Sequence, residues 1–385
     1  MDNKPLRIMR EELEEIMLSP YATRSSRAKR KKWKKPCDVR TEFQRDRDRI
    51  LYSKAFRRLM HKTQVFIAPE GDHYRTRLTH TLEVSQIART IARALRLNDD
   101  LTEAISLGHD LGHAPFGHAG ESALNILMNE FTGKGFHHSL QSLRVVDYLE
   151  RDGGLNLTLQ VRNGIVSHTK GKSDLDGPAV FEEPQTLEAE VVRVSDRLAY
   201  INHDIDDAIR AGIIKKEDLP KKAVELFGHG ISKRVNAMVL DIVHSSWEKP
   251  HITMSTRISD GIKILKDFMF NNVYTNSPAK EEEYKAFFII RQLFEHFMRN
   301  PGIIPPVIVE RGGGKGLRYA QYCPREDIDI ESVSIEYMDD LDRNFRAQAV
   351  CDFIAGMTDR YAVAIHSELF IPKSWGARGF KIEER

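Results

Sequence analysis

Apolar residues recur every three or four positions from about Thr41 to the carboxyl end of the chain, and few stretches alternate as strands do. This period is that of an amphipathic helix, so the pattern predicts a mostly α-helical fold with at most a few short strands. One helix is expected from about Thr79 to Leu97, with His80 on its inward face, and further long helices are expected from Ser334 to Phe370. The sequence Val307-Ile308-Val309 is a candidate short strand.

A second helix is expected to end at a group of polar residues. The sequence Asn98-Asp99-Asp100 is typical of a helix start, and Gly112 and Pro115 are residues that end helices. The helix between them should carry His109 and Asp110 at its carboxyl end. The polar group would then lie where a helix opens into a loop.

A long helix is predicted from about Leu187 to Arg210. Its apolar stripe consists of Leu187, Val191, Val194, Leu198, Ile201, Ile205 and Ile209. The opposite side carries Asp196, Tyr200, His203, Asp204 and Asp207. Such a polar side ordinarily faces solvent, but a helix that lines a cleft would show the same pattern.

Composition indicates a soluble globular protein. The chain has 385 residues, of which 41% are hydrophobic and 30% charged, and no apolar run is long enough to span a bilayer. Its first residues mix acidic and basic side chains, which fits neither a secretory signal nor a transit peptide, so a cytoplasmic protein without membrane contact is expected. Cys37, Cys323 and Cys351 lie far apart without a CxxC pair, which favours reduced thiols over disulfides or a thiolate metal site.

One segment stands out by its charge. The net charge is only +2, but residues 22–35 hold eight basic side chains and no acidic one. Such an arm could bind the backbone of single-stranded nucleic acid, and Trp33 within it could stack on a base. A solvated loop or a contact between subunits would explain the same composition.

Candidate chemistry is concentrated in the stretch from His109 to Glu121, where three histidines and two carboxylates occur in thirteen residues. Imidazole and carboxylate together suit a divalent transition ion, and residues not used as ligands could act as acid, base or phosphate partner. Histidines that cap the end of a solvated helix are the structural alternative. The density of the cluster, together with distant histidine and aspartate partners, favours a metal-centred catalytic site.

The expected metal ligands are His80, His109, Asp110 and Asp196. Mixed nitrogen and oxygen ligation suits manganese, iron, nickel or zinc better than calcium, and such an ion lowers the pKa of bound water and neutralises phosphoryl charge. Hydrolysis of a phosphoester is the reaction that fits this chemistry best.

Three further residues of the cluster are candidates for the reaction itself. His118 and Glu121 are three residues apart and could form a pair in which the carboxylate orients the imidazole for proton transfer or water activation. His113 is separately placed to donate to a phosphate oxygen.

These residues lie in longer sequence words that resemble a known family. The pattern of a His, a later His-Asp doublet and a still later Asp is that of the HD-domain metal hydrolases. The words Arg77-Leu78-Thr79-His80-Thr81-Leu82-Glu83-Val84, Leu107-Gly108-His109-Asp110-Leu111-Gly112-His113 and Asn202-His203-Asp204-Ile205-Asp206-Asp207-Ala208 are similar to the deoxyguanosine triphosphate triphosphohydrolase (dGTPase) branch. The resemblance extends from about Arg40 to Met357-Thr358-Asp359-Arg360-Tyr361-Ala362.

The resemblance implies an HD-domain helical bundle with additional carboxyl-terminal helices. Residues 1–40 would form an amino-terminal helix and the basic arm, residues 41–215 the metal-hydrolase core, and residues 216–385 a mostly helical region that completes the pocket and the oligomer contacts. Apart from the resemblance, the residues from Phe131 to Ser142 themselves predict a loop-rich stretch.

The resemblance also implies an activity and assigns roles. A deoxynucleoside triphosphate (dNTP) would be hydrolysed at the α-phosphate to a deoxynucleoside and tripolyphosphate. His80, His109, Asp110 and Asp196 would hold the metal, and His118, Glu121, His113 and His138 would be catalytic. The substrate-binding residues would be Gln64 and Val65 at the edge of the sugar pocket, Arg77 and Arg197 at the phosphates, and Tyr200 and Asp204 at the deoxyribose.

Cofactor and partners follow from the same resemblance. Mn²⁺ or Mg²⁺ is expected, with Fe²⁺, Co²⁺, Ni²⁺ or Zn²⁺ as alternatives, and a dNTP could also act as an allosteric activator. A homo-oligomer, a hexamer by resemblance, is expected, and Lys315, Arg343 and Arg346 could add phosphate contacts. Two alternatives stay open, an HD-domain phosphodiesterase or nucleotidase that acts on another phosphoester, and a nucleic-acid-binding regulator with a reduced active site.

Overall fold

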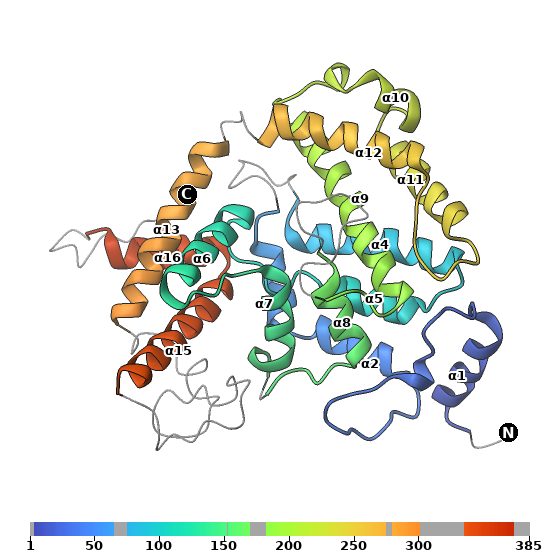
Figure 1. Ribbon diagram of the computed structural model, residues 1–385, viewed down its shortest axis with the longest axis horizontal. Helices are drawn as coiled ribbons and strands as arrows, with labels where there is room; N and C mark the ends of the chain where they lie inside the picture. Colours follow the sequence, from blue (N-terminus) through green and yellow to red (C-terminus); the bar gives the residue numbers. More distant parts are fainter. Residues whose placement is uncertain are drawn as a thin grey trace, which may run out of the picture.

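Helices make up the fold in this computed structural model, which describes residues 4–64, 75–151, 153–169, 182–274, 279–300 and 335–372 (Figure 1). Within these ranges no strand occurs, and the β pairing consists of two isolated bridges, Arg30 with Thr158 and Thr63 with Thr76. The expectation of a mostly α-helical fold is therefore confirmed. The candidate strand at Val307-Ile308-Val309 lies outside the described residues.

A first group of helices surrounds α4, α5 and α9, which pack against one another through a shared hydrophobic core (Figure 1). Side chains such as Ile91, Ile105 and Leu198 are fully buried there. The helices of this group are α2 (Glu42–Leu51), α3 (Lys54–Arg58), α4 (Arg77–Ala94), α5 (Asp99–Gly108), α8 (Leu159–Ser167) and α9 (Leu187–Arg210). Two further helices, α11 (Ile231–Ser246) and α12 (Thr256–Met269), pack against α9. Both contact α10 (Lys221–Phe227), and the π-helical turn Phe270–Tyr274 packs against α12.

Capping residues set where the central helices begin. The side chains of Thr76, Asn98 and Thr186 each accept a hydrogen bond from the backbone of the first turn of α4, α5 and α9. The predicted bounds of α9 are confirmed, whereas α4 begins two residues earlier than expected because Thr76 and Thr79 form a reciprocal capping box.

A second group of helices has a hydrophobic core of its own. Its members are α6 (Gly117–Thr132), α13 (Ala279–Arg299), α15 (Ile335–Ala355) and α16 (Asp359–Phe370). Leu124 and Leu127 of α6 are fully buried in the same cluster as Phe294 and Phe297 of α13. Figure 1 shows α6 against α13 and α15, beside the first group. A helix from the end of the first third of the chain thus depends on the last third of the chain for its packing.

The segment between the two groups corrects one expectation. The stretch from Phe131 to Ser142 is not mainly loop, because α6 continues to Thr132 and α7 begins at His138 and runs to Arg144. His137 starts α7 by accepting a hydrogen bond from a backbone N–H of the first turn. A π-helical turn over Val145–Leu149 follows.

The basic arm is partly used within the fold. Arg24 is buried and donates to three backbone carbonyls, and Arg30 forms an ion pair with the buried Asp46 of α2. Other members face outward, and Trp33 is 85% exposed. The exposed basic residues of the arm are Arg27, Lys29, Lys31, Lys32, Lys34 and Lys35.

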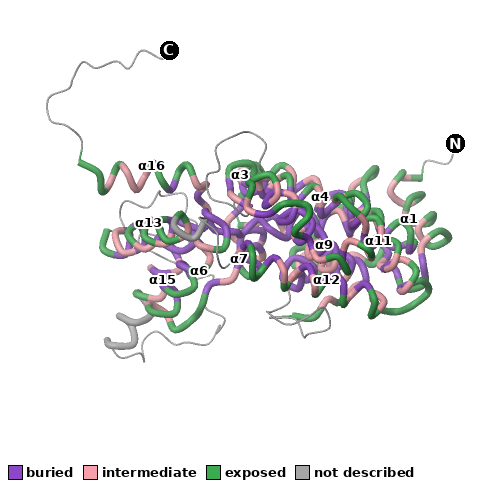
Figure 2. The backbone as a smooth tube through the Cα atoms, turned by 90° about the horizontal axis from the view of Figure 1, so that it is seen from above, coloured by how far each residue is buried: buried purple, intermediate pink, exposed green. Residues whose placement is uncertain are grey.

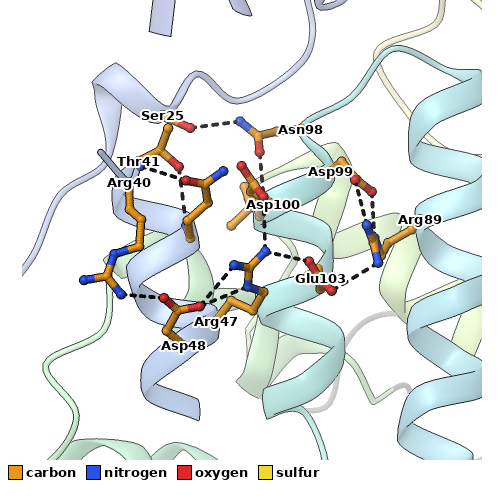
Figure 3. A network of polar contacts seen from close by, with 12 residues as sticks. Ser25, Arg40, Thr41, Arg47, Asp48, Arg89, Asn98, Asp99, Asp100 and Glu103 are labelled. Carbon is orange, nitrogen blue, oxygen red and sulfur yellow. Dashed lines mark hydrogen bonds and ion pairs between the residues drawn. The ribbon is translucent and has the colours of Figure 1, made fainter. Parts of the chain in front are cut away.

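Polar contacts fasten the amino-terminal segments to α4 and α5 (Figure 3). The guanidinium groups of Arg47 in α2 and Arg89 in α4 both donate to Glu103 in α5, at 3.2 and 3.1 Å. Asn98 donates to Ser25, within the basic arm, at 3.3 Å.

Burial is greatest along the middle of the molecule, where α4 and α9 lie, while α1 (Leu6–Met17) has no buried residue (Figure 2). Among the helices that the structure describes, none combines the length and apolar character required to span a bilayer.

Candidate metal centre and catalytic pocket

The four predicted metal ligands meet where α4, α5 and α9 come together. His80 comes from α4, His109 and Asp110 directly follow α5, and Asp196 comes from α9. Nε2 of His80 lies 3.0 Å from Oδ1 of Asp196, and Nε2 of His109 lies 3.7 Å from the same oxygen and 3.5 Å from Oδ1 of Asp110. Ligand atoms of His80, His109 and Asp110 all lie within 4.8 Å of one another, and Asp196 contacts both histidines, so the structure brings together residues that are up to 116 positions apart.

His109 provides the clearest sign that the cluster fits a metal ion. Its Nδ1 lies 2.6 Å from the backbone carbonyl of Ser106, which can only accept, so Nδ1 carries the proton and Nε2 has a free lone pair. That Nε2 atom is fully buried and has no hydrogen-bond partner. Because buried polar atoms are nearly always paired, a cation bound between the ligands explains the orphaned nitrogen.

The charges around the cluster favour the ionised form of the Asp110 carboxyl. Burial alone would raise the pKa of Asp110, but the nearby imidazoles of His109 and His113 and the guanidinium of Arg77 hold it well below its usual range. Arg77 donates to Asp110 at 2.8 Å in a fully buried pair. Asp110 is therefore a carboxylate, the form that ligates metals.

A second cluster, the His/Glu wall, adjoins the metal ligands and consists of His113, His118, Glu121 and His138. Nδ1 of His118 lies 3.8 Å from Glu121, as the predicted pair requires, but the shorter contact of Glu121 is to Nδ1 of His138, at 2.8 Å. The rings of His113 and His138 stack with centroids 4.2 Å apart. Glu121 thus joins two histidines, one from its own helix α6 and one from α7.

A close backbone approach makes this wall possible. The loop after α5 contacts α7 at Gly112, whose N–H donates to Oγ of Ser142 at 2.8 Å. A Cβ atom at Gly112 would lie only 2.1 Å from the backbone nitrogen of Ser142. Only glycine therefore allows α7 to come near enough for His138 to reach Glu121 and His113.

Both clusters open into one cavity of about 390 Å³. Ten of the predicted site residues line it, namely Gln64, Arg77, His80, Asp110, His113, His118, His138, Asp196, Arg197 and Tyr200. His109 and Glu121 do not line the cavity. Each contacts a residue that does, His109 contacting Asp110 and Glu121 contacting His138. Val65 lies outside the described residues. The polar side of α9 therefore lines a cleft and does not face solvent along this part of its length.

Asp204 lies next to the cavity and is completely buried. Tyr274, at the end of the π-helical turn after α12, donates a hydrogen bond to its Oδ2, and the rings of Tyr274 and Tyr200 are stacked with centroids 6.3 Å apart. Tyr200 also contacts His118, edge to face, at a ring-centroid distance of 6.2 Å. The aromatic end of the cavity thus adjoins the His/Glu wall.

Burial raises the pKa of Asp204 from its ordinary value of 3.8 to about 7. Between these two values the folded protein holds a proton that the unfolded chain has lost, so this group makes the fold less stable as the pH rises towards 7. Asp204→Asn removes the titration, and each unit of pKa shift corresponds to ~1.4 kcal/mol. The melting temperature of the variant relative to wild type should therefore rise by several degrees between pH 5 and pH 8. Parallel melting curves for the two proteins over this range would contradict the expectation.

Several lining residues were not predicted from the sequence. They are His168 and Thr169 after α8, Arg193 and Val194 in α9, Ile201, and Lys266 in α12. Arg193 could have been found, because it lies one turn before Arg197 on the helix face that already carried Asp196 and Tyr200. His168, Lys266 and the nearby Tyr274 carried no such signal, since helix packing alone brings their segments to the cavity.

The arginines of α15 do not reach this cavity. The guanidinium of Arg343 lies 5.1 Å from the centre of the Phe131 ring, and Arg346 donates to the backbone carbonyl of Met298. Lys315 lies outside the described residues.

Comparison with known proteins places the chain in a family. Residues 77–201 match the HD domain, and residues 252–317 and 331–368 match the phosphohydrolase-associated domain. A deoxyguanosinetriphosphate triphosphohydrolase-like protein of Caldanaerobacter subterraneus subsp. tengcongensis is 50% identical over 96% of this chain and 97% of its own length. Proteins with the same description from Desulfatibacillum aliphaticivorans and Clostridium perfringens are 46% and 43% identical, each over 94% of this chain and 97% of their own length.

These matches cover both the helices that carry the metal cluster and the helices that support the His/Glu wall. The chain is a phosphohydrolase with a His/Asp cluster that can hold a divalent metal. It belongs to the HD-domain family of deoxyguanosinetriphosphate triphosphohydrolase-like proteins.

Proposed function

We propose that this phosphohydrolase acts on deoxynucleoside triphosphates and cleaves them at the α-phosphate, which releases a deoxynucleoside and tripolyphosphate. The observation that carries the proposal is the composition of the cavity, which combines a metal-ligand set, a His/Glu wall, a group of cationic side chains and a tyrosine. The names of the relatives, which are dGTP triphosphohydrolase-like, support the same substrate class.

The metal would be held by His80, His109, Asp110 and Asp196, and Mn²⁺ or Mg²⁺ is the proposed ion. When bound, it would supply charge neutralisation at the phosphoryl group and make a bound water easier to deprotonate. The unpaired Nε2 of His109 is the feature of this chain that such an ion would satisfy.

The cationic side chains would bind the triphosphate. Arg77, Arg193, Arg197 and Lys266 all line the cavity, and a guanidinium group can contact two phosphate oxygens at once. His113, stacked on His138, would donate a hydrogen bond to the α-phosphate. The substrate would then lie with its α-phosphorus near both the metal ligands and the His/Glu wall.

The bond that breaks joins the α-phosphorus to the 5′-oxygen, and the bond that forms joins the same phosphorus to the oxygen of water. The departing 5′-oxygen needs a proton, which His118 would donate while Glu121 stabilises its charged imidazolium form. His118 suits this role because its side chain is 64% exposed to the cavity and solvent, whereas His113 and His138 are largely buried.

The sugar would lie at the aromatic end of the cavity. Tyr200 would contact the deoxyribose ring, Asp204 would lie near its 3′-hydroxyl, and Gln64 and Val65 would form the edge of this subsite. We also propose three partners for the chain. A dNTP would act as an allosteric activator, and copies of the chain would form a homo-oligomer. Single-stranded nucleic acid would bind to the exposed part of the basic arm.

A product assay tests the substrate and the cleavage position together. The protein, supplied with Mn²⁺ or Mg²⁺, is incubated with each of the four dNTPs and with GTP, alone and in pairs. We expect chromatography to show a deoxynucleoside and intact tripolyphosphate in equal amounts. Formation of deoxynucleoside monophosphate and pyrophosphate would reject cleavage on the nucleoside side of the α-phosphate, and turnover of other phosphoesters alone would reject the substrate class. Activity with mixed dNTPs only would indicate allosteric activation.

A further inference from the structure

The turn that leads into α6 has an unfavourable backbone conformation, which contacts with other segments have to stabilise. Phe116 and Gly117 both have left-handed backbone angles, with φ of 63° and 57°. Such angles are unfavourable for an aromatic residue. Phe116 is also the residue before the first turn of α6, and it provides no side-chain oxygen for the free N–H groups of that helix. The turn therefore lacks the local interactions that usually fix the start of a helix.

Asp359, in the first turn of α16, supplies an acceptor from the far end of the chain. Its Oδ1 accepts the backbone N–H of Phe116 at 2.9 Å. Its Oδ2 accepts both the backbone N–H of Thr63, at 2.9 Å, and the hydroxyl of Thr63. One carboxylate thus joins α16, the start of α6 and the segment before α4. Its negative charge also lies at the positively polarised end of α6.

Lys62 fixes the other end of the same turn. Its side chain is buried, and its ammonium group donates to the backbone carbonyl of His113 and, at 2.8 Å, to that of Ala355 at the end of α15. The turn from His113 to Gly117 is therefore held at both ends by contacts that also involve the α15–α16 connection. His118 and Glu121 follow directly in the first turns of α6.

We propose that Asp359 and Lys62 are positioning residues, which transmit the packing of α15 and α16 to the turn that presents His118 and Glu121. The inference rests on the proposed role of these two residues in hydrolysis. The two halves of the site are packed into different cores. The helix α6, which carries His118 and Glu121, belongs to the second hydrophobic core, whereas the helices that supply the metal ligands belong to the first. Without the Asp359 link, His118 and Glu121 would move relative to the metal ligands, which would stay together.

The test compares Asp359→Ala and Asp359→Asn with Thr358→Ala. Thr358 is a matched control, because its side chain caps α16 beside Asp359 but contacts neither Phe116 nor Thr63. For Asp359→Ala we expect kcat to fall by about 10²-fold, since a misplacement of about 1 Å can cost that much. Its KM and metal content should stay within about twofold of wild type. Asp359→Asn keeps one acceptor oxygen and should lie between wild type and Asp359→Ala, whereas Thr358→Ala should lower the melting temperature but not kcat.

Hydrogen exchange separates a positioning role from a loss of fold. In Asp359→Ala the amides of residues 116–121 should exchange faster, while those of α4 and α5 keep their wild-type rates. Unchanged kcat in Asp359→Ala, or an equal loss of kcat in Thr358→Ala, would overturn the inference. If the wild-type protein hydrolyses no dNTP, the proposed function fails by itself, and unchanged exchange at residues 116–121 would still refute the link from Asp359 to the turn.

Discussion

Glu121→Gln should lower kcat by a factor of about 10²–10⁴, the usual contribution of general acid–base catalysis, while the protein keeps its metal. Burial alone would raise the pKa of Glu121, but the imidazoles of His138 and His118 hold it well below its usual range, so it is a carboxylate. Glutamine has nearly the same size but no charge, and it cannot stabilise a protonated imidazole on either side. The loss should therefore appear in kcat with little change in KM. Steady-state assays with the substrate identified by product analysis, together with metal content per chain, measure both.

Glu130→Gln is the matched control for this variant. Glu130 lies on the same helix, its side chain is 47% exposed, and its ion pair is with Arg291, away from the cavity. We expect this variant to keep wild-type kcat. His118→Ala should resemble Glu121→Gln, and the double variant should be little worse than either, because residues that act as a unit are not additive. If Glu121→Gln retained full turnover, Glu121 would have no part in the reaction.

Asp196→Asn should remove most of the bound metal and reduce hydrolysis to the level of chelator-treated wild-type protein. Asp196 is the ligand to replace because its close contacts are with His80 and His109, both of which are expected ligands. Replacing Asp110 would also leave the buried charge of Arg77 unpaired, which would confuse loss of metal with loss of stability. Metal analysis of the purified protein and activity across a range of Mn²⁺ concentrations provide the measurement.

Asp206→Asn makes the same change on the same helix, at a partly exposed position paired with Arg75 and Arg210. It should keep both metal and activity. Asp196→Asn with wild-type metal content and wild-type kcat would show that the ion, if one is needed, binds elsewhere. Loss of activity with full metal content would instead give Asp196 a role other than ligation.

The helices around the metal cluster could be predicted because their local signals agree with their packing. The bounds of α9 were visible from the stripe between Leu187 and Ile209 and from its polar opposite side. Gly112 and Pro115 indicated the end of α5 to within a few residues, since the helix ends at Gly108 and His109 and Asp110 follow it directly. His80 and Asp196 could be joined to this pair through the family's pattern of His, His-Asp and Asp, because spacing alone does not say which distant helix supplies a ligand.

Other parts of the site depend on packing that has no local signature. The bond between Glu121 and His138 requires α7 to approach Gly112, and a sequence pattern shows neither the approach nor the early start of α7. Lys266 and Tyr274 belong to helices that reach the cavity only because α12 packs across α9. The sequence also could not show whether the polar side of α9 faces solvent or lines a cleft, because both faces give the same pattern of polar and apolar residues.

The positions of the two hydrophobic cores along the chain also determine the order in which they can form during synthesis. The helices that carry the metal ligands lie between Arg77 and Arg210, and their hydrophobic core also includes residues of α10, α11 and α12, so it can be completed once the chain has been made as far as Val273. The apolar face of α6 has to wait for α13 and α15, and the turn before it for α16. On a chain that ends before α13, the metal ligands can therefore come together while the turn that presents His118 and Glu121 still lacks its contacts with α15 and α16.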